Sequence, residues 1–327
     1  MAGGPSTVAL VTAASGAGAF AFLAGGYKRA PEMAAEMRAV RDAGMQTFGV
    51  NVFVPGPPTA DAGRLLEYVA SLEAEAAAVG GTLGVPSWDD DDYAAKVEVL
   101  LAQPPAAVSF TFGLPDPSVV GALQAAGTLV LFTVTTPEEA ASALRLGPDA
   151  LCLQGAEAGA HRGSLDNEDH ADADRSVRSL LAAVRRRTLA PLVAAGGVGG
   201  PEDVRDLLRR GATMVLAGTA FLRSDESGAA PVVKDALASA HFAASGTVVT
   251  RAFSGRRARS LVNAMTRGHA EAPAAYPEVN NATRPLRAAA VRAGDAEHMS
   301  LYAGTAFARA EARPAAEIVE RLVSGLS

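Results

Sequence analysis

The chain has 327 residues, of which 49% are hydrophobic and 20% charged, and its formal net charge is −6. That much apolar material can form a large buried core, so global disorder is excluded, and the length fits one large domain with a smaller appendage. The acidic balance argues against a nucleic-acid partner, which requires a basic face. The basic clusters Arg185–Arg187 and the pair Arg256 and Arg257 are therefore interpreted as structural.

The cysteine and the N-terminal segment exclude further classes. Cys152 is the only cysteine, so an internal disulfide and a cysteine metal cluster are impossible. It lies in an apolar run, which predicts a buried strand residue and favours the reducing cytoplasm. Residues 1–27 carry no charge, but their glycines and alanines predict a buried helix and strand, and no membrane span is expected.

Strands and helices are predicted to alternate along most of the chain. Short apolar runs bounded by Gly or Pro predict strands at Ala19–Ala24, Gln46–Val54, Ala106–Phe112, Thr128–Val134, Ala150–Gln154, Leu192–Val198 and Thr213–Ala220. Helices, several of which open with Pro followed by Glu or Asp, are predicted at Pro31–Ala43, Asp91–Ala102, Pro117–Ala126, Pro137–Leu146, Ala173–Arg187, Pro201–Arg210 and Ala315–Val323. This alternation predicts a parallel α/β sheet, and the number of units favours a (β/α)₈ TIM barrel.

Two segments interrupt the alternation. A Pro-rich excursion follows the second predicted strand, and residues 222–296 show helical patterning with no predicted strand. We therefore expect a barrel made of residues 1–54, 86–221 and 300–327, and a helical substrate or lid domain made of residues 55–85 and 222–299. The acids Asp89–Asp92 are predicted to charge and cap the next helix, with a metal site as the alternative.

Two glycine-rich strand ends predict a phosphate site. Gly196 and Gly197 follow one strand and precede a helix, and Leu216, Ala217, Gly218 and Thr219 end the next strand. Exposed backbone N–H groups at strand ends and a helix N-terminus can hold a phosphate monoester. A dinucleotide fingerprint, a Walker lysine and an H-E-x-x-H motif are all missing, so the ligand is a phosphorylated substrate or a mononucleotide such as FMN.

The densest polar cluster runs from Gln154 to Gly163, at the end of a predicted strand. His161 lies on this loop, where it can give or take a proton, and Gly159 lets the backbone approach a ligand. Asn51, an amide among apolar residues, needs a buried partner that a ligand or neighbouring backbone supplies. The remaining histidines, His170, His241, His269 and His298, are assigned to the surface or to the helical segment.

Together these residues resemble the nitronate monooxygenases, formerly called 2-nitropropane dioxygenases, which are FMN-dependent (β/α)₈ barrels with a helical substrate domain. The resemblance covers almost the whole chain. The segments that carry it are Met1–Thr7, Phe22–Tyr27, Gly49–Phe53, Ser109–Gly113, Gln154–Gly163, Ala194–Val198, Gly218–Phe221, Thr250–Arg256 and Ser300–Gly304.

The resemblance implies a flavin site and a reaction. FMN would be bound by Asn51, Gln154, Gly159, Gly196, Gly197 and Leu216–Thr219, with His161 as the catalytic histidine and Tyr27, Tyr276 and Tyr302 as pocket candidates. A nitronate would reduce the flavin and O₂ would reoxidise it, giving nitrite and a carbonyl product. His161 would remove a proton from a neutral nitroalkane, or position and neutralise a nitronate. No metal is implied, and the protein would be a monomer or homodimer.

Two alternatives stay open, an FMN-dependent enoyl-thioester or NAD(P)H:quinone reductase of the same barrel group, and a non-catalytic flavin-binding relic. The chain also departs from the family pattern, since Leu216 stands where Gln is frequent and Ala160 where Gly is frequent, which adds a methyl group beside His161. The first barrel strand of the family is absent. We therefore expect a start residue downstream of the natural one, or weakened stability and FMN retention.

Overall fold

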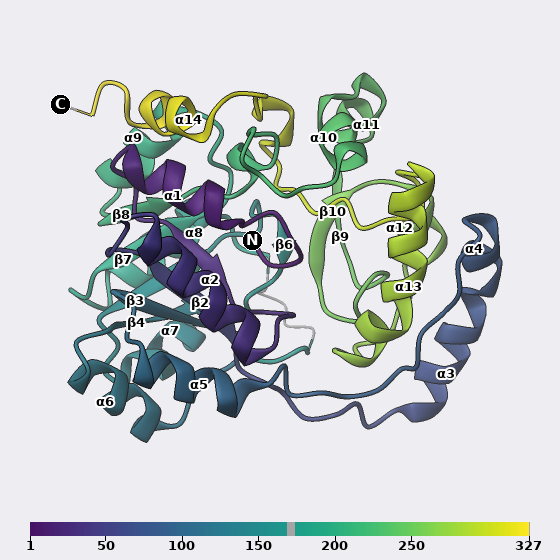
Figure 1. The fold of residues 1–327 in the computed structure, drawn as a ribbon, viewed down its shortest axis with the longest axis horizontal. Coiled ribbons are helices and arrows are strands. Elements are labelled where there is room, and N and C mark those ends of the chain that lie inside the picture. Colours follow the sequence, from purple (N-terminus) through teal and green to yellow (C-terminus); the bar gives the residue numbers. More distant parts are fainter. Residues whose placement is uncertain (169–173, 327) are drawn as a thin grey trace.

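A computed structural model describes residues 1–168 and 174–326 of the chain, which form two lobes (Figure 1). The described residues of the larger lobe contain a curled sheet of seven parallel strands, in which each strand pairs with its neighbour in chain order. These strands are β1 (Phe22–Ala24), β2 (Gly49–Phe53), β3 (Ala107–Thr111), β4 (Leu129–Val134), β5 (Ala150–Gln154), β7 (Leu192–Ala195) and β8 (Met214–Leu216). The predicted TIM-barrel-like fold and the position of every predicted strand are confirmed, with several ends shorter than predicted.

Helices cover the outer face of this sheet. They are α1 (Val8–Gly16), α2 (Ala30–Asp42), α5 (Tyr93–Ala102), α6 (Pro117–Ala125), α7 (Pro137–Leu144), α8 (Val177–Arg185), α9 (Pro201–Arg209), the 3₁₀ turn η1 (Thr219–Phe221) and α14 (Ala315–Val323). Local signals start them, as in α7, where Thr136 accepts a hydrogen bond from the Glu139 N–H at 3.1 Å. Their apolar faces and the strands share one buried core, which includes Val50, Phe110 and Leu153.

The sheet does not close into a complete barrel. β1 and β8 are its two ends, and the side chains of Met214 and Leu216 on β8 are 56% and 39% exposed. The layer of helices outside the sheet does close into a ring, because α14 packs against both α1 and α9. The structure therefore agrees with the prediction of a barrel that lacks one strand.

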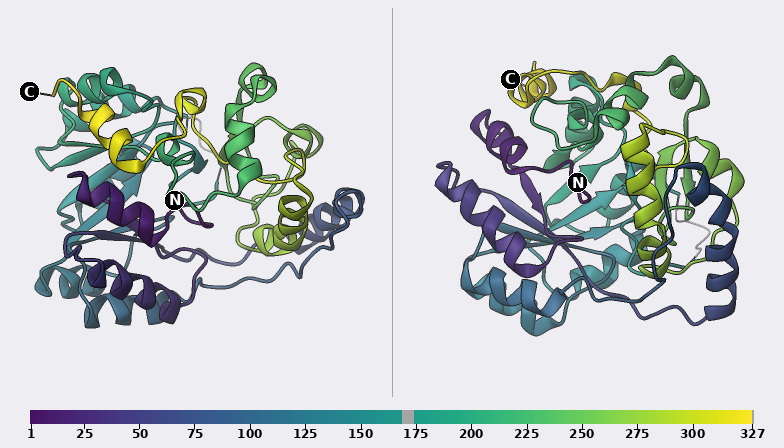
Figure 2. Two further views of the ribbon diagram at one scale, coloured as in Figure 1. Left: turned by 45° about the horizontal axis from the view of Figure 1, so that its top comes forward. Right: turned by 45° about the vertical axis from the view of Figure 1, so that its right-hand side comes forward.

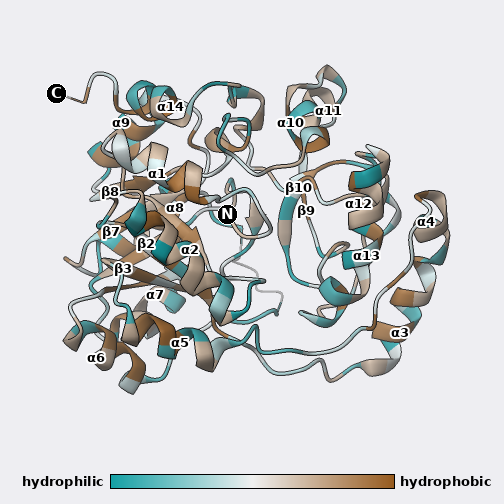
Figure 3. Cartoon of the chain, in the orientation of Figure 1, coloured by the Kyte–Doolittle hydropathy of each residue, from teal (hydrophilic) through white to brown (hydrophobic). Residues whose placement is uncertain are grey.

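The smaller lobe combines helices with a short antiparallel sheet (Figure 2). Its elements are α3 (Ala62–Ser71), α4 (Glu73–Ala78), α10 (Pro231–Ala238), α11 (Ala240–Ser245), β9 (Thr247–Thr250), β10 (Ala258–Leu261), α12 (Ala264–Gly268) and α13 (Glu278–Ala293). The 3₁₀ turn η2 (Phe307–Arg309) contacts both α10 of this lobe and η1 of the larger one. The excursion α3–α4 packs against α13. Apolar residues occur in both lobes (Figure 3), and the smaller lobe has its own buried clusters.

The prediction that residues 222–296 contain no strand is wrong. β9 and β10 pair with each other, and β10 also pairs with β6 (Ala160–His161). The β-branched run Thr247–Thr250 is a strand signal that the surrounding helical pattern obscured.

The interpretation of the acids Asp89–Asp92 as caps of the next helix is also wrong. Asp92 directly precedes α5 but makes no side-chain cap there, and its carboxylate accepts the Ala30 N–H of α2 at 2.8 Å. Asp91 accepts the Tyr27 N–H at 2.8 Å. The Asp89–Asp92 loop thus contacts the start of α2, and the spacing of residues in the sequence does not reveal such a contact between distant segments. Among the described residues, no group of at least three His, Cys, Asp or Glu side chains could hold a metal ion.

Other predictions concern burial. Cys152 is buried in β5, as predicted, and burial raises the pKa of its thiol to about 12. No helix in residues 1–168 and 174–326 has both the length and the apolar character needed to cross a membrane. His170 and the predicted helix start at Ala173 lie outside the described residues.

The open edge of β8 generates a testable expectation. The Met1 side chain lies near Gly218, just beyond the end of β8, so a short apolar strand fused before Met1 can run parallel to β8 and cover Met214 and Leu216. We expect this extension to raise Tm by about 4 °C or more, measured by thermal unfolding. A matched extension with two prolines, which cannot pair, is the control. Equal melting temperatures for the two extensions would contradict the expectation.

Candidate active site

His161 is held where the two lobes meet. It lies on β6, which pairs antiparallel with β10 so that His161 is opposite Ala258. The next residue, Arg162, donates its N–H to the carbonyl of Arg257 at 2.7 Å. The position of the imidazole therefore depends on the barrel, which supplies β6, and on the smaller lobe, which supplies β10.

The side chain of Gln154 holds the loop that carries His161. Its Nε2 donates to the carbonyl of His161 at 2.9 Å, and its Oε1 accepts the N–H of Gly163 at 2.8 Å. Arg162, which is 2% exposed, donates to Gln154 Oε1 at 3.0 Å and to the Gly155 carbonyl at 2.6 Å. The described contacts of Gln154 thus shape the histidine loop, and its contact with a flavin stays a prediction.

The imidazole forms a hydrogen bond with a serine hydroxyl of the smaller lobe. His161 Nε2 lies 2.8 Å from Ser254 Oγ, and that hydroxyl lies 3.2 Å from the Arg256 carbonyl. In the tautomer with the proton on Nε2, Ser254 accepts from Nε2–H and donates to this carbonyl, and the lone pair of Nδ1 is available. Burial, together with the positive charges of Arg256 and Arg287, lowers the pKa of His161 to about 3, so the imidazole is neutral at pH 7.

Four aromatic rings surround the imidazole, and three of them are the predicted pocket tyrosines. Ring centroids lie at 5.2 Å for Tyr302, 5.7 Å for Tyr276, 5.7 Å for Phe112 and 6.5 Å for Tyr27. Burial raises the pKa of all three tyrosines, so their hydroxyls stay protonated and can donate. The hydroxyls of Tyr27 and Tyr276 lie 3.3 Å apart, and the buried Tyr302 hydroxyl interacts with Ser254, which opposes the rise in the pKa of Tyr302.

Two arginines give the site a positive charge. The Arg256 guanidinium is 4.0 Å above the Phe112 ring and donates to the carbonyls of Ser164 and Asp166. Arg287 donates to the carbonyl and side-chain oxygens of Asn280 at 3.0 and 2.8 Å.

Arg256, Arg287, Ser254 and Phe112 have no site role predicted from sequence. Charge clustering alone predicts a structural role for Arg256. Ser254 is 93 residues from His161, so spacing offered no signal for their contact.

Strained backbone is concentrated at this site. In residues 1–168 and 174–326, five non-glycine residues have a left-handed φ: Tyr27 (67°), Asp91 (55°), Asp92 (56°), Phe112 (79°) and Ala160 (64°). Tyr27 and Phe112 contact His161, Ala160 precedes it, and the two acids support the segment that begins at Tyr27. The prediction that Ala160 adds only a methyl group is therefore incomplete, because its backbone conformation favours glycine.

The predicted phosphate-binding glycines follow the adjacent strands β7 and β8. The N–H groups of Gly196 (φ 122°), Gly197 (φ 70°) and Gly218 donate no hydrogen bond to any described residue. The helix N-terminus beside them is not free, because the Asp203 carboxylate accepts the N–H groups of Gly199 and Gly200 at 3.0 and 3.2 Å. The N–H groups of these three glycines therefore remain available to a phosphate, whereas those of Gly199 and Gly200 just before α9 do not.

The other predicted cofactor residues have different surroundings. Gly159 packs so closely against Ala303 and Gly304 that a Cβ would lie 2.4 Å from the Gly304 nitrogen. Thr219 Oγ1 accepts the Gly304 N–H at 2.9 Å. Asn51 Nδ2 donates to the hydroxyls of Ser109 and Thr111 at 2.7 and 2.9 Å, and its side-chain carbonyl oxygen, Oδ1, accepts no hydrogen bond from the described part of the chain. Leu216 is exposed and Ala217 half-buried.

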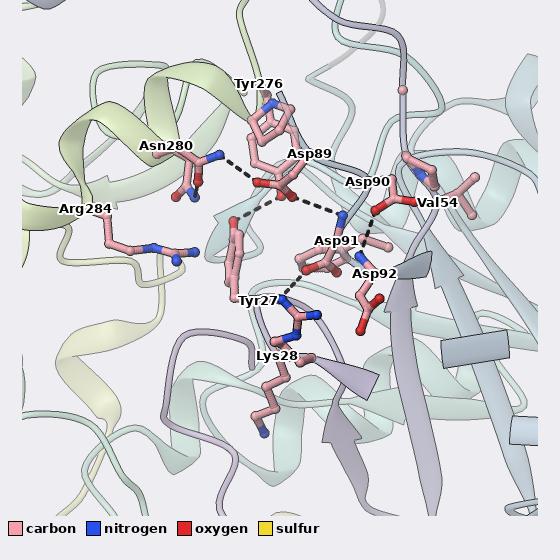
Figure 4. Close-up of a pocket in the computed structure, with 16 residues that line it drawn as sticks. Tyr27, Lys28, Val54, Asp89, Asp90, Asp91, Asp92, Tyr276, Asn280 and Arg284 are labelled. Atoms are coloured by element: carbon pink, nitrogen blue, oxygen red, sulfur yellow. Dashed lines mark hydrogen bonds between the residues drawn. The ribbon is translucent and has the colours of Figure 1, made fainter. Parts of the chain in front are cut away.

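A cavity of about 510 Å³ lies outside the histidine site (Figure 4). Tyr27 and Tyr276 line this outer cavity and also contact His161, which does not line it. The Asp89–Asp92 loop and Arg284, whose guanidinium is 6.0 Å from the Tyr27 ring centre, form other parts of its wall. The two tyrosines thus separate the histidine from the outer cavity.

Comparisons with known proteins agree with this geometry. Residues 1–325 match the family model described as nitronate monooxygenase. A nitronate monooxygenase of Pseudomonas aeruginosa is 38% identical over 99% of this chain and 93% of its own. A nitronate monooxygenase of Paraburkholderia phytofirmans is 34% identical over 98% and 88%, respectively.

Solved structures show the same similarity. A nitroalkane oxidase from Streptomyces ansochromogenes superposes with a TM-score of 0.95 at 46% identity, covering 100% of this chain and 93% of that chain. FabK from Thermotoga maritima has a TM-score of 0.72 at 25% identity and covers 99% and 89%. The chain therefore belongs to the nitronate monooxygenase family and is an oxidoreductase.

Proposed function

We propose that the protein oxidises alkyl nitronates with O₂, using bound FMN, and releases nitrite and a carbonyl product. The observation that carries this proposal is the environment of His161, a neutral imidazole enclosed by tyrosine side chains and influenced by two guanidinium charges. This arrangement suits a small anion whose negative charge lies on oxygen atoms.

The residues present fit FMN. The unpartnered N–H groups of Gly196, Gly197 and Gly218 lie at the carboxyl ends of neighbouring strands, where they would bind the phosphate. Asn51 would present its carbonyl oxygen to the ring system, and His161 would lie at the reactive edge. When bound, FMN supplies the redox chemistry of the reaction. We assign its binding to residues 1–54, 86–221 and 300–327, and the substrate lid to residues 55–85 and 222–299.

The protein groups have separate tasks in this proposal. Arg256 and Arg287 supply positive potential for the nitronate oxygens, and the protonated Tyr302 hydroxyl can donate to one of them. His161 is neutral before substrate binds, so charge compensation begins with the arginines and not with the imidazole. A bound anion raises the pKa of His161 again, because an opposite charge favours its protonated form.

The lowered pKa also distinguishes the two substrate classes. Removing the carbon-bound proton of a neutral nitroalkane requires His161 as a base, and a pKa far below the working pH makes that base weak. A nitronate already lacks this proton. The site therefore favours nitronates over neutral nitroalkanes.

The first test is turnover itself. Purified, FMN-loaded protein should release nitrite from ethylnitronate under air without NAD(P)H, measured colorimetrically beside oxygen uptake. Anaerobic addition of the nitronate should bleach the visible flavin spectrum. Fast flavin bleaching by NAD(P)H, with no nitrite from the nitronate, would instead support the reductase alternative. Protein that cannot be reconstituted with FMN would support the non-catalytic relic.

Replacement of His161 should separate the two substrate classes. We expect His161→Gln to lower kcat/KM for neutral nitroethane by about 10²-fold, the lower end of the range for a general base, because the low pKa of His161 makes it a weak one. The loss with ethylnitronate should be about tenfold or less, because no proton is abstracted. His241→Gln, a change at an exposed histidine of α11, is the control and should leave both values unchanged. Equal losses with the two substrates would rule out His161 as the base.

The proposed binding of the FMN phosphate by the N–H groups of Gly196, Gly197 and Gly218 is tested by the affinity for FMN. Gly197→Ala places a side chain at a left-handed residue and should displace its N–H, so we expect FMN to bind about tenfold more weakly. The readout is the FMN dissociation constant from flavin fluorescence. Gly127→Ala introduces the same kind of strain (φ 83°) in the turn before β4, where an added Cβ meets nothing within 4 Å. Equal FMN affinity in the two variants would argue against phosphate binding by these glycines.

A further inference from the structure

The segment that carries Tyr27 is held by a buried carboxylate. The backbone of Tyr27 is left-handed, with a φ of 67°, a conformation that costs about 1–3 kcal/mol for a residue with a side chain. Its N–H donates to Asp91 Oδ1 at 2.8 Å. Asp91 lies 64 residues further along the chain, on the loop before α5. A tertiary hydrogen bond therefore supports a strained conformation next to the active site.

Asp91 is held in turn by Lys96 of α5. Asp91 Oδ2 lies 2.7 Å from Lys96 Nζ, and the side chains are 16% and 1% exposed, respectively. Burial raises the pKa of Asp91, while Lys96 and the Tyr27 N–H oppose that rise and Asp89 adds to it. Buried ion pairs contribute little net stability because both groups lose their hydration. The geometric effect of this pair is to direct the second carboxylate oxygen at Tyr27.

Tyr27 forms part of the wall around His161. Its ring packs edge-on against Phe53, with centroids 5.5 Å apart, and its hydroxyl lies 3.3 Å from that of Tyr276. Both tyrosines contact His161 and line the outer cavity (Figure 4). A shift of the Tyr27 backbone would move this wall and join the histidine site to the outer cavity.

We propose that Asp91, fixed by Lys96, is a positioning residue that sets the place of Tyr27 and thereby the affinity of the site for small nitronates. Asp91 acts through the Tyr27 peptide and touches no reacting atom. The kinetic part rests on the proposed function, whereas the placement of Tyr27 does not.

Two double variants separate the hydrogen bond from the charges. Asp91→Asn with Lys96→Met removes both charges but keeps an oxygen acceptor for the Tyr27 N–H. Asp91→Ala with Lys96→Met removes both charges and the acceptor. Asp116→Ala is the control, because it removes a carboxylate bond of equal length, 2.8 Å, from the Ser118 N–H at the start of α6, and Asp116 neither packs against the His161 ring nor lines the outer cavity.

The first readout is independent of turnover. The chain has five tyrosines, so labelling with 3-fluorotyrosine yields five ¹⁹F signals, assigned with Tyr→Phe variants. We expect the signals of Tyr27 and Tyr276 to shift in the alanine double variant and to stay in place in the asparagine double variant and in Asp116→Ala. An unshifted Tyr27 signal in the alanine variant would overturn the proposal, as would equal shifts in both double variants.

The second readout is the separation of KM from kcat in the FMN-loaded protein. The alanine double variant should raise KM for ethylnitronate about tenfold, the factor expected for one lost hydrogen bond to a charged group, with kcat within about twofold. The asparagine double variant should restore KM. A ¹⁹F shift with unchanged KM would overturn the link to substrate affinity. Wild-type protein without nitrite release would instead refute the proposed function and leave the ¹⁹F result to decide the positioning.

A third measurement covers the case in which the alanine variant does not fold. In wild-type protein labelled with ¹⁵N-tyrosine, the bonded amide proton of Tyr27 should exchange slowly with solvent. Fast exchange of this proton would contradict the hydrogen bond on which the proposal depends.

Discussion

The pairing of β6 with β10 is the contact on which the active site depends. β6 belongs to a loop at the end of barrel strand β5, and β10 belongs to the smaller lobe. His161 therefore has a defined position only when the two lobes are packed together. The aromatic residues around it also come from both lobes, since Phe112 belongs to the barrel and Tyr276 to the smaller lobe. Residues from both lobes also remove the imidazole from water, and this desolvation is the main cause of its lowered pKa.

The site is built at a cost to stability. Left-handed residues, buried arginines and a buried ion pair are each unfavourable unless the surroundings support them. Here the supports are specific, since Asp91 holds Tyr27, and Gln154 and Arg162 hold the histidine loop. The large apolar core below the sheet supplies the stability that permits this arrangement. Function is thus concentrated at the carboxyl ends of the strands, while the strands themselves are packed for stability.

Much of the fold was predictable, and the failures have physical causes. The parallel strands were found because they are apolar on both faces and bounded by Gly or Pro, a signal that is local in the chain. β9 and β10 were missed because each is only four residues long and lies within a helical segment. The role of Asp89–Asp92 was misread because their partners, at Tyr27 and Ala30, lie more than sixty residues away. Distant partners leave no periodic signal in the sequence.

The sequence by itself determined the alternation of strands and helices, the glycine-rich strand ends and the resemblance that identified His161, because each depends on residue types at short spacing. Only the tertiary structure decided the hydrogen-bond partner of His161, the grouping of Tyr27, Tyr276 and Tyr302 around it, and the contacts of Ser254, Arg256 and Arg287. It also showed that Asp203 occupies the start of α9, which sequence reasoning had left open for a phosphate. These features are set by burial and by contacts between distant segments, and such contacts exist only when the chain is folded.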